Sequence, residues 1–218
     1  ASAEVIALLG LTPVIVDVDP NTFVITPEAI ERAITQKTRA IIPVHLFGQC
    51  AQMEGIMQIA EKHNLFVIED VAQANGAWVE FSNGKKYKAG TIGHFGCTSF
   101  FPSKNLGCYG DGGAIFSNDS SLSEKCQMIT NHGMKIRYHH DIIGVNSRLD
   151  TIQAAILRVK LKYLDDYNYR RQWAASYYDR HLSNIERIQI PERTPFSSHI
   201  FHQYTLIVRN GLRDALKT

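Results

Sequence analysis

Lys104 stands in an unusual sequence environment for a lysine. It lies in the segment TSFFPSKNLGCYGDGGAIF, among small polar residues and glycines and between two apolar runs. A lysine in such a setting could act as a nucleophile, while Ser99, Ser103 and the neighbouring backbone N–H groups could bind a phosphate. The glycines that follow permit unusual backbone angles and the close approach of a ligand. A glycine-rich turn that carries a surface lysine is an equally good interpretation of this segment taken alone.

Asp70 and Gln73 follow another apolar run, in the segment LFVIEDVAQANGA. Doubly wound sheets bind ligands at the carboxyl ends of their strands, and an aspartate there could hold a cationic ring nitrogen. Gln73 lies three residues further on, so both side chains could face one ligand if a helical turn begins there. Alternatively, Asp70 is a helix N-cap or a surface carboxylate, and Gln73 is an exposed polar residue.

Short apolar runs alternate with helical stretches in the first half of the chain. This alternation predicts an α/β fold in which a mainly parallel sheet is sandwiched by helices. The apolar runs predict strands at 13–18, 39–43, 65–68, 97–101 and 113–117, the periodicity predicts helices at 26–34 and 53–63, and Asn83-Gly84 predicts a tight hairpin turn. From Asp150 onward a pattern of about thirty residues without proline predicts a long helix, and Gln203 to Val208 predicts one later strand.

The composition excludes several classes of protein. A hydrophobic fraction of 44% and a charged fraction of 20% over 218 residues are typical of a folded globular chain. The 23 basic and 21 acidic residues nearly balance, so no electrostatic surface for nucleic acid or for an anionic membrane is expected. No apolar run is long enough to cross a membrane, and we expect a soluble, cytoplasmic protein. The spacing of the four cysteines matches neither a zinc site nor a disulfide framework, so we expect reduced thiols.

A metal site is not expected among the histidines. His139 and His140 are adjacent, and adjacent side chains point in different directions. His199 and His202 are three residues apart, but no carboxylate stands at a fixed spacing beside them.

Five sequence blocks, taken in order, resemble the DegT/StrS-type nucleotide-sugar aminotransferases. The blocks are ASAEVIALLG with PVIVDVD, then IIPVHLFGQ, VIEDVAQANGA, TSFFPSKNLGCYGDGGAI and GVNSRLDTIQAAIL. Members of this family are fold-type I enzymes that use pyridoxal 5′-phosphate. The resemblance therefore implies the large domain of the fold-type I pyridoxal-phosphate transferases, followed by the start of a smaller C-terminal α/β domain.

The resemblance also assigns roles to residues of this chain. By similarity, Lys104 is the catalytic Schiff-base lysine, and Asp70 is the catalytic carboxylate that pairs with the pyridine nitrogen of the cofactor. Gln73 is expected to meet the phenolic oxygen of the cofactor and Ser99 its phosphate. Asn146 in GVNSR is similar to the family asparagine that reaches the phosphate from the neighbouring subunit, which implies a homodimer with shared active sites.

The segment RYHHDIIGVNSRLD is similar to the branch of the family that acts on 3-keto sugar nucleotides. Tyr138, His139, His140 and Arg148 are the substrate-binding candidates, because cationic groups there could meet a diphosphate or a sugar carboxylate. Equally, Arg148 and Asp150 could cap or pair at the start of the long helix. The resemblance implies residues 1–150 as the cofactor-binding large domain, 151–190 as a connecting helix and 191–218 as the beginning of a small domain. It also implies that an upstream segment and a longer C-terminal domain belong to the complete protein.

The implied activity is the transfer of an amino group, by family habit from glutamate, to a keto sugar attached to a nucleoside diphosphate, in polysaccharide or glycoconjugate biosynthesis. Two alternatives stay open. One is a sugar dehydratase relative, but that branch carries a histidine in place of the lysine. The other is a non-catalytic binding or regulatory protein that has kept the fold, and the joint presence of Asp70, Gln73, Ser99 and Lys104 argues against it.

Overall fold

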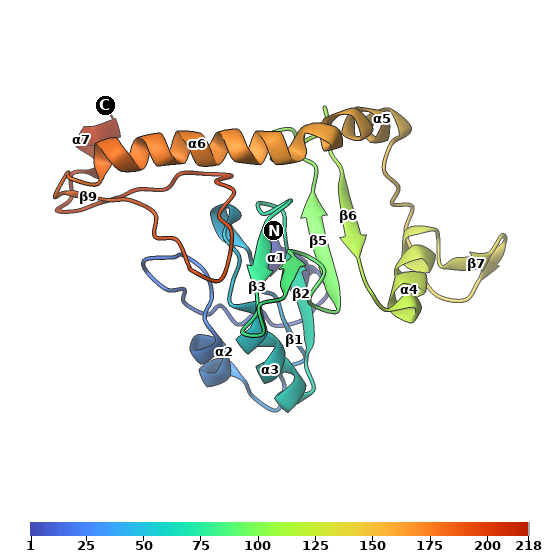
Figure 1. The fold of residues 1–218 in the computed structure, drawn as a ribbon. Helices are drawn as coiled ribbons and strands as arrows, with labels where there is room; N and C mark the ends of the chain where they lie inside the picture. Colours follow the sequence, from blue (N-terminus) through green and yellow to red (C-terminus); the bar gives the residue numbers. More distant parts are fainter. Residues whose placement is uncertain (218) are drawn as a thin grey trace.

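The computed structural model describes residues 1–217. Its centre is a four-stranded sheet with the order β1-β2-β5-β6 (Figure 1). The strands are β1 (Ala40–Ile41), β2 (Phe66–Asp70), β5 (Phe95–Ser99) and β6 (Gly113–Phe116). The first three are mutually parallel and β6 is antiparallel to β5. The prediction of an α/β fold with a mainly parallel sheet is therefore confirmed.

Seven α-helices and three two-stranded ribbons complete the described part of the chain. The helices are α1 (Ser2–Leu8), α2 (Pro27–Ala33), α3 (Met53–His63), α4 (Ser120–Thr130), α5 (Thr151–Lys160), α6 (Leu164–Leu182) and α7 (Arg213–Lys217). The ribbons pair β3 (Trp78–Glu80) with β4 (Lys86–Lys88), β7 (Met134–Ile136) with β8 (His139–His140), and β9 (Ile188–Gln189) with β10 (Ile207–Val208). Two 3₁₀ turns are η1 (Leu46–Gly48) and η2 (Leu161–Tyr163).

Local sequence explains most of these elements. Helix α2 begins where Pro27 follows Thr26, whose hydroxyl accepts a hydrogen bond of 3.2 Å from the Ala29 N–H. Helix α3 ends at Asn64, which adopts the left-handed conformation that closes helices. In the hairpin between β3 and β4, Gly84 has φ +78° and Asn83 accepts from the Lys85 N–H.

Two apolar clusters hold the sheet and the long helices together. The larger one lies between α2, α3, β1 and β2, and includes Met53, Ile56, Val67 and Val71, all almost fully buried. The smaller one contains Phe100, Leu106, Cys108, Leu157 and Leu164. It packs α5 and α6 against the loop that follows β5, because burying this apolar surface removes it from water. The four cysteines are free, as expected.

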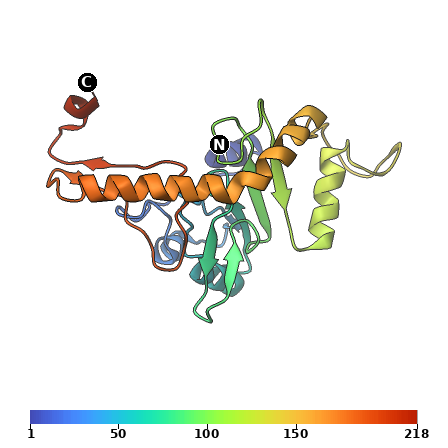
Figure 2. The same cartoon turned by 45° about the horizontal axis from the view of Figure 1, so that its top comes forward.

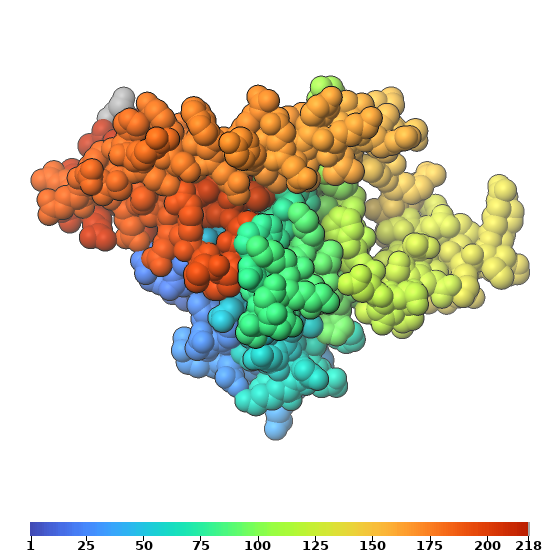
Figure 3. Space-filling view, viewed as in Figure 1, coloured from blue at the N-terminus to red at the C-terminus, as the bar shows by residue number. Residues whose placement is uncertain are grey.

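Helices α5 and α6 run across the end of the sheet at which β2 and β5 finish (Figures 1 and 2). The predicted long helix is thus present, but η2 interrupts it at 161–163. In the space-filling view these helices form a continuous ridge, and the segment containing α4, β7 and β8 projects from the side of the molecule (Figure 3). We call residues 131–150 the arm.

Two predicted strands are wrong or too long. Residues 13–18 form no strand, although Val14 and Ile15 are apolar, because a strand needs a ladder partner and none of residues 1–217 pairs with this segment. Both side chains are exposed there. The strand expected at 203–208 is reduced to Ile207–Val208, because only these residues meet β9. Across residues 1–217, no helix combines the length and apolar character needed to span a membrane.

Candidate functional site

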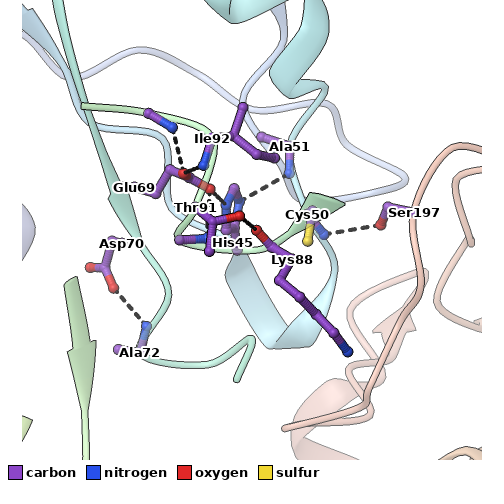
Figure 4. A network of polar contacts seen from close by, with 12 residues as sticks. His45, Cys50, Ala51, Glu69, Asp70, Ala72, Lys88, Thr91, Ile92 and Ser197 are labelled. Carbon is purple, nitrogen blue, oxygen red and sulfur yellow. Dashed lines mark hydrogen bonds and ion pairs between the residues drawn. The ribbon is translucent and has the colours of Figure 1, made fainter. Parts of the chain in front are cut away.

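Asp70 is the last residue of β2, and two donors fix its carboxylate. Oδ1 accepts a hydrogen bond of 3.0 Å from the backbone N–H of Ala72, which Figure 4 shows. Oδ2 accepts one of 2.6 Å from the hydroxyl of Ser2 in α1. The side chain is partly buried and still accessible. A carboxylate held in one orientation at a strand end can bind a cationic group that lies against it.

Gln73 lies in the turn that follows β2, not in a helix. Its Oε1 accepts a hydrogen bond of 2.6 Å from the backbone N–H of Phe47. This contact identifies the amide oxygen and leaves the Nε2 group without a hydrogen-bond partner within residues 1–217. The Nε2 group of Gln73 is therefore available as a hydrogen-bond donor.

Ser99 and Lys104 belong to the neighbouring strand β5 and to the loop after it. Strands β2 and β5 are parallel with Asp70 opposite Cys97, so the loop after β5 starts beside the end of β2. Ser99 ends β5 and is partly buried, and its hydroxyl accepts from the Phe101 N–H at 3.2 Å. Lys104 is partly buried in a tight turn, and its backbone N–H donates to the Phe101 carbonyl at 2.9 Å. The parallel register thus brings the carboxylate, the amide, the hydroxyl and the amine to one edge of the sheet.

A chain of buried amides links this edge to the long helix. Asn105 Nδ2 donates to Asn168 Oδ1 of α6 at 2.7 Å, and Asn168 Nδ2 donates to the carbonyl of Asn75 at 3.0 Å. Asn75 follows Gln73, and Asn105 follows Lys104. Helix α6 therefore joins the two loops that carry the candidate residues.

His202 shares the surroundings of Lys104. Its Nδ1 lies 3.1 Å from Asn105 Oδ1. Because Asn105 uses its Nδ2 group as a donor to Asn168, Oδ1 must accept, so Nδ1 of His202 carries the proton. Burial and the nearby positive charges of Lys104 and Arg171 lower the pKa of His202 to about 4.

Close backbone contact within the loop after β5 requires a glycine at position 107. A Cβ on Gly107 would lie 2.5 Å from the Pro102 carbonyl oxygen, which no side chain tolerates. Lys160 of α5 donates to the Gly107 carbonyl. The turn around Lys104 is therefore closed by backbone contact and held by the long helix.

The remaining candidates lie on the arm and not beside Asp70 (Figure 1). Tyr138, His139, His140, Asn146 and Arg148 are all exposed. Asn146 Oδ1 accepts from Arg148 Nε at 3.0 Å. Within residues 1–217, none of these side chains forms a hydrogen bond or ion pair with Asp70 or Lys104.

The N-terminus of α5 shows which of the two predicted residues caps the helix. Asp150 caps α5, since its Oδ1 accepts from the Ile152 N–H at 2.8 Å. Arg148 contacts Asn146 and not Asp150. The expected cap is thus present, and Arg148 is not part of it.

Several neighbours of the site were missed by the sequence analysis. Ser2 contacts Asp70 from 68 positions away, and Asn105 and Asn168 bond to each other across 63 positions; no local pattern marks such contacts. Phe47 belongs to the block IIPVHLFGQ, which marked the region but not its role. No group of three His, Cys, Asp or Glu side chains within residues 1–217 could hold a metal ion.

The donor set defines the kind of group that fits this edge of the sheet. A fixed carboxylate suits a cationic ring nitrogen, a free amide N–H suits a phenolic oxygen, a hydroxyl suits a phosphate, and an amine suits an aldehyde carbon. These are the groups by which pyridoxal 5′-phosphate is recognised. The residues present therefore fit this cofactor.

Comparison with known proteins identifies the family of the chain. The family model described as the DegT/DnrJ/EryC1/StrS aminotransferase family matches residues 1–218. The chain is 49% identical over 218 residues to the UDP-N-acetyl-3-dehydro-α-D-glucosamine 3-aminotransferase of Acidithiobacillus ferrooxidans. It is 47% identical over 214 residues to the UDP-2-acetamido-2-deoxy-3-oxo-D-glucuronate aminotransferase of Pseudomonas aeruginosa. These matches cover 100% and 96% of this chain but only 57% of each relative, so the chain spans little more than half of their length.

The fold of the chain also matches that of a solved protein structure. The crystal structure of NtdA from Bacillus subtilis with bound cofactor PMP superimposes with a TM-score of 0.86 at 35% identity, and covers 98% of this chain and 48% of that one. A family model that matches the whole chain, with this agreement in sequence and fold, is decisive. The chain belongs to the DegT/DnrJ/EryC1/StrS aminotransferase family.

Proposed function

We propose that the protein to which this chain belongs is a pyridoxal 5′-phosphate-dependent aminotransferase acting on nucleotide sugars. It transfers an amino group, from glutamate, to the keto carbon of a sugar attached to a nucleoside diphosphate. The observation that carries the proposal is that Asp70, Gln73 and the loop of Lys104 lie at the carboxyl ends of two adjacent parallel strands.

When bound, pyridoxal phosphate supplies a protonated ring that draws electrons away from the reacting carbon. Asp70 would hold the proton on the ring nitrogen, because its fixed carboxylate favours the cationic form. Gln73 Nε2 would donate to the phenolic oxygen and the Ser99 hydroxyl to the phosphate. Lys104 Nζ would first attach the cofactor and then, as a free amine, move a proton between two carbons.

The active unit in this proposal is a homodimer. Asn146 would reach the phosphate bound by the neighbouring subunit, and Tyr138, His139, His140 and Arg148 would meet the substrate there. The exposed arm supports this arrangement, because its residues lie away from the chain's own Asp70 and include Ile143, which is 98% exposed. A cationic and hydrogen-bonding arm is suited to the diphosphate or to a sugar carboxylate.

The substrate class in this proposal is a 3-keto sugar nucleotide, used in the cytoplasm for polysaccharide or glycoconjugate biosynthesis. Its support is the activity of the two relatives, which are named as aminotransferases of a 3-dehydro and a 3-oxo sugar nucleotide. The proposal assigns residues 1–150 to a cofactor-binding large domain, 151–190 to a connecting segment and 191–218 to the start of a small domain. In support, α5 and α6 pack on the loop of Lys104, and the later strands β9 and β10 pair with each other and not with the four-stranded sheet.

The test uses the full-length protein with pyridoxal phosphate. Borohydride treatment followed by mass spectrometry should place the cofactor on Lys104. Incubation with glutamate and a panel of 3-keto and 4-keto sugar nucleotides should give an aminated product from the 3-keto substrates. Loss of water without amine transfer would instead identify a dehydratase, and failure to bind the cofactor would identify a non-catalytic relative. Either result would refute the proposal.

A further inference from the structure

Glu69, the residue before Asp70, is a buried carboxylate that the proposed reaction does not use. Its side chain is 0% exposed. Oε2 lies 2.9 Å from His45 Nε2 and accepts from the Gly90 N–H at 2.8 Å. Oε1 accepts from the N–H groups of Ile92 and Gly93, each at 2.7 Å. These contacts, drawn in Figure 4, provide four donors for one carboxylate.

The four donors keep Glu69 ionised in the core. Burial alone would raise its pKa, but the hydrogen bonds from His45 and from the backbone of Gly90 and Gly93 outweigh burial, and the pKa lies below its usual value. A buried carboxylate tolerates this position only when its oxygens are satisfied. Removing one donor therefore costs more than an average hydrogen bond.

The hydrogen-bond partners of His45 define its protonation state. Its side chain is also 0% exposed. Nδ1 accepts from the Ala51 N–H at 3.2 Å, so Nδ1 holds no proton. Nε2 must then carry the hydrogen that is donated to Glu69. The ring of His45 is thus in the Nε2–H form and donates to the Glu69 carboxylate.

The main chain around His45 contacts Asp70, the last residue of β2, and Gln73, in the turn that follows. The His45 N–H donates to the Asp70 carbonyl at 3.0 Å. Two residues later, the Phe47 N–H donates to Gln73 Oε1 at 2.6 Å. The segment 45–47 therefore fixes the backbone of one residue and the side chain of the other.

This segment is held in a strained conformation. Phe47 has φ +58°, in the left-handed region that non-glycine residues rarely occupy. Gly48 follows with φ +103°, and a Cβ there would lie 2.9 Å from Ile200 Cγ1. Such a turn persists only when its surroundings determine it. The His45 ring, clamped between Glu69 and Ala51 at the start of the turn, is one such constraint.

We propose that the buried His45–Glu69 pair is a positioning device: it anchors the turn 45–48 and thereby orients Asp70 and Gln73 toward the cofactor. The inference rests on the proposed function for the identity of that cofactor. His45 touches neither substrate nor cofactor in this proposal. Its hydrogen bond to Glu69 acts through the turn.

A matched pair of variants separates the two hydrogen bonds of the His45 ring. In His45→Gln, the amide nitrogen takes the place of Nε2 and still donates to Glu69. In His45→Asn, the amide oxygen takes the place of Nδ1 and still accepts from Ala51, but Glu69 loses a donor. Both variants lose one ring contact, so a merely structural role lowers the melting temperature and the cofactor affinity of both in parallel.

The expected result is a difference between the two variants in the full-length protein. His45→Gln should bind pyridoxal 5′-phosphate within about threefold of the wild type, while His45→Asn should bind at least about tenfold more weakly. His45→Asn should also lower kcat and leave KM for the sugar nucleotide unchanged, because the displaced groups face the cofactor. Equal affinities for the two variants, or wild-type affinity in His45→Asn, would overturn the proposal.

Two further measurements keep the proposal testable in every case. Nitrogen NMR of the protein without cofactor should show the proton on Nε2 of His45 and none on Nδ1, as the two hydrogen bonds of the ring require; a proton on Nδ1 would contradict the proposal. If the His45→Asn protein does not fold, the Glu69→Gln variant is measured in its place. The amide N–H group of the new glutamine faces an N–H donor, so this variant should also bind the cofactor at least about tenfold more weakly. A wild-type protein that binds no pyridoxal phosphate refutes the proposed function, whereas a wrong His45 protonation state refutes only this inference.

Discussion

The hydroxyl of Ser2 donates a hydrogen bond of 2.6 Å to Oδ2 of Asp70, 68 residues further along the chain. Together with the Ala72 N–H on Oδ1, it leaves the carboxylate with one orientation. Hydrogen bonds to an ionised group are about twice as strong as those between neutral groups. Helix α1 thus contributes directly to the geometry of the candidate catalytic carboxylate.

Ser2→Ala tests this contact. Because Asp70 loses one of the two hydrogen bonds that fix it, we expect pyridoxal phosphate affinity to fall by about three- to tenfold. Ser2→Thr keeps a hydroxyl and should recover most of the affinity. Titration of the apoprotein, followed by absorbance, measures both. An unchanged affinity in Ser2→Ala would show that Ala72 alone fixes the carboxylate.

Substitutions of the two candidate catalytic residues should have different effects on cofactor attachment and turnover. Lys104→Ala should abolish covalent attachment of the cofactor and turnover, because the chain then lacks the amine at this position. Asp70→Asn should keep the attachment but lower kcat by about 10²- to 10⁴-fold, since a neutral amide cannot stabilise the proton on the ring nitrogen. Borohydride labelling and steady-state kinetics distinguish the two. Attachment retained in Lys104→Ala would refute the assignment of that residue.

Asn168 joins the loop of Asp70 to the loop of Lys104 through Asn75 and Asn105. Asn168→Ala removes both hydrogen bonds at a buried position, and we expect the free energy of unfolding to fall by about 1–3 kcal/mol. The exposed Asn184 provides the matched control, because its replacement by alanine should change stability little. Denaturant unfolding measures the difference. Equal effects of the two substitutions would contradict a linking role for Asn168.

Elements with strong local determinants were predicted well. Helix α3 occupies Met53–His63, as the amphipathic pattern predicts, and Asn83-Gly84 forms the expected turn. The segment 13–18 failed because a strand is defined by its partner, and its own β-branched residues carry no information about that partner. Local sequence thus predicts helices and hairpins better than isolated strands.

In the candidate site, too, residues in local sequence blocks were predicted and residues from distant segments were not. Asp70 and Lys104 became candidates because their sequence blocks resemble a family. Residue types alone favoured a helix cap or a surface carboxylate for Asp70, and made a surface lysine and a nucleophile equally good interpretations of Lys104. Ser2 and Asn168 were missed, because their importance arises only when the fold brings distant segments together. The expectation that the arm residues meet a cofactor in a second subunit stays a prediction.

His199 and His202 should make the protein sensitive to mild acid. Burial lowers the pKa of His199 to about 3 and that of His202 to about 4, below the 6.5 of an unperturbed histidine. Between these values and about 6.5 the unfolded chain binds more protons than the folded one, so stability is complete above about pH 6.5 and decreases as the pH falls toward 4.

Melting temperatures measured across this range provide the test. His199→Asn retains an acceptor for the Phe201 N–H, which His199 Nδ1 accepts at 3.1 Å, and removes the titrating ring. Its melting temperature should therefore depend less steeply on pH than that of the wild type. His63→Asn, at an exposed position, should leave the slope unchanged. Equal slopes in all three proteins would refute the role of His199.

Shared active sites predict that two inactive variants restore activity when mixed. Asn146→Ala removes the residue expected to reach the neighbouring subunit, and Lys104→Ala removes the amine of the chain's own site. In a mixed dimer, one site would carry both substitutions and the other neither. Unfolding and refolding an equimolar mixture should recover about a quarter of wild-type activity, because half of the dimers are mixed and each has one intact site. If Asn146 instead serves its own chain, every site keeps a defect, and the mixture stays as inactive as its components.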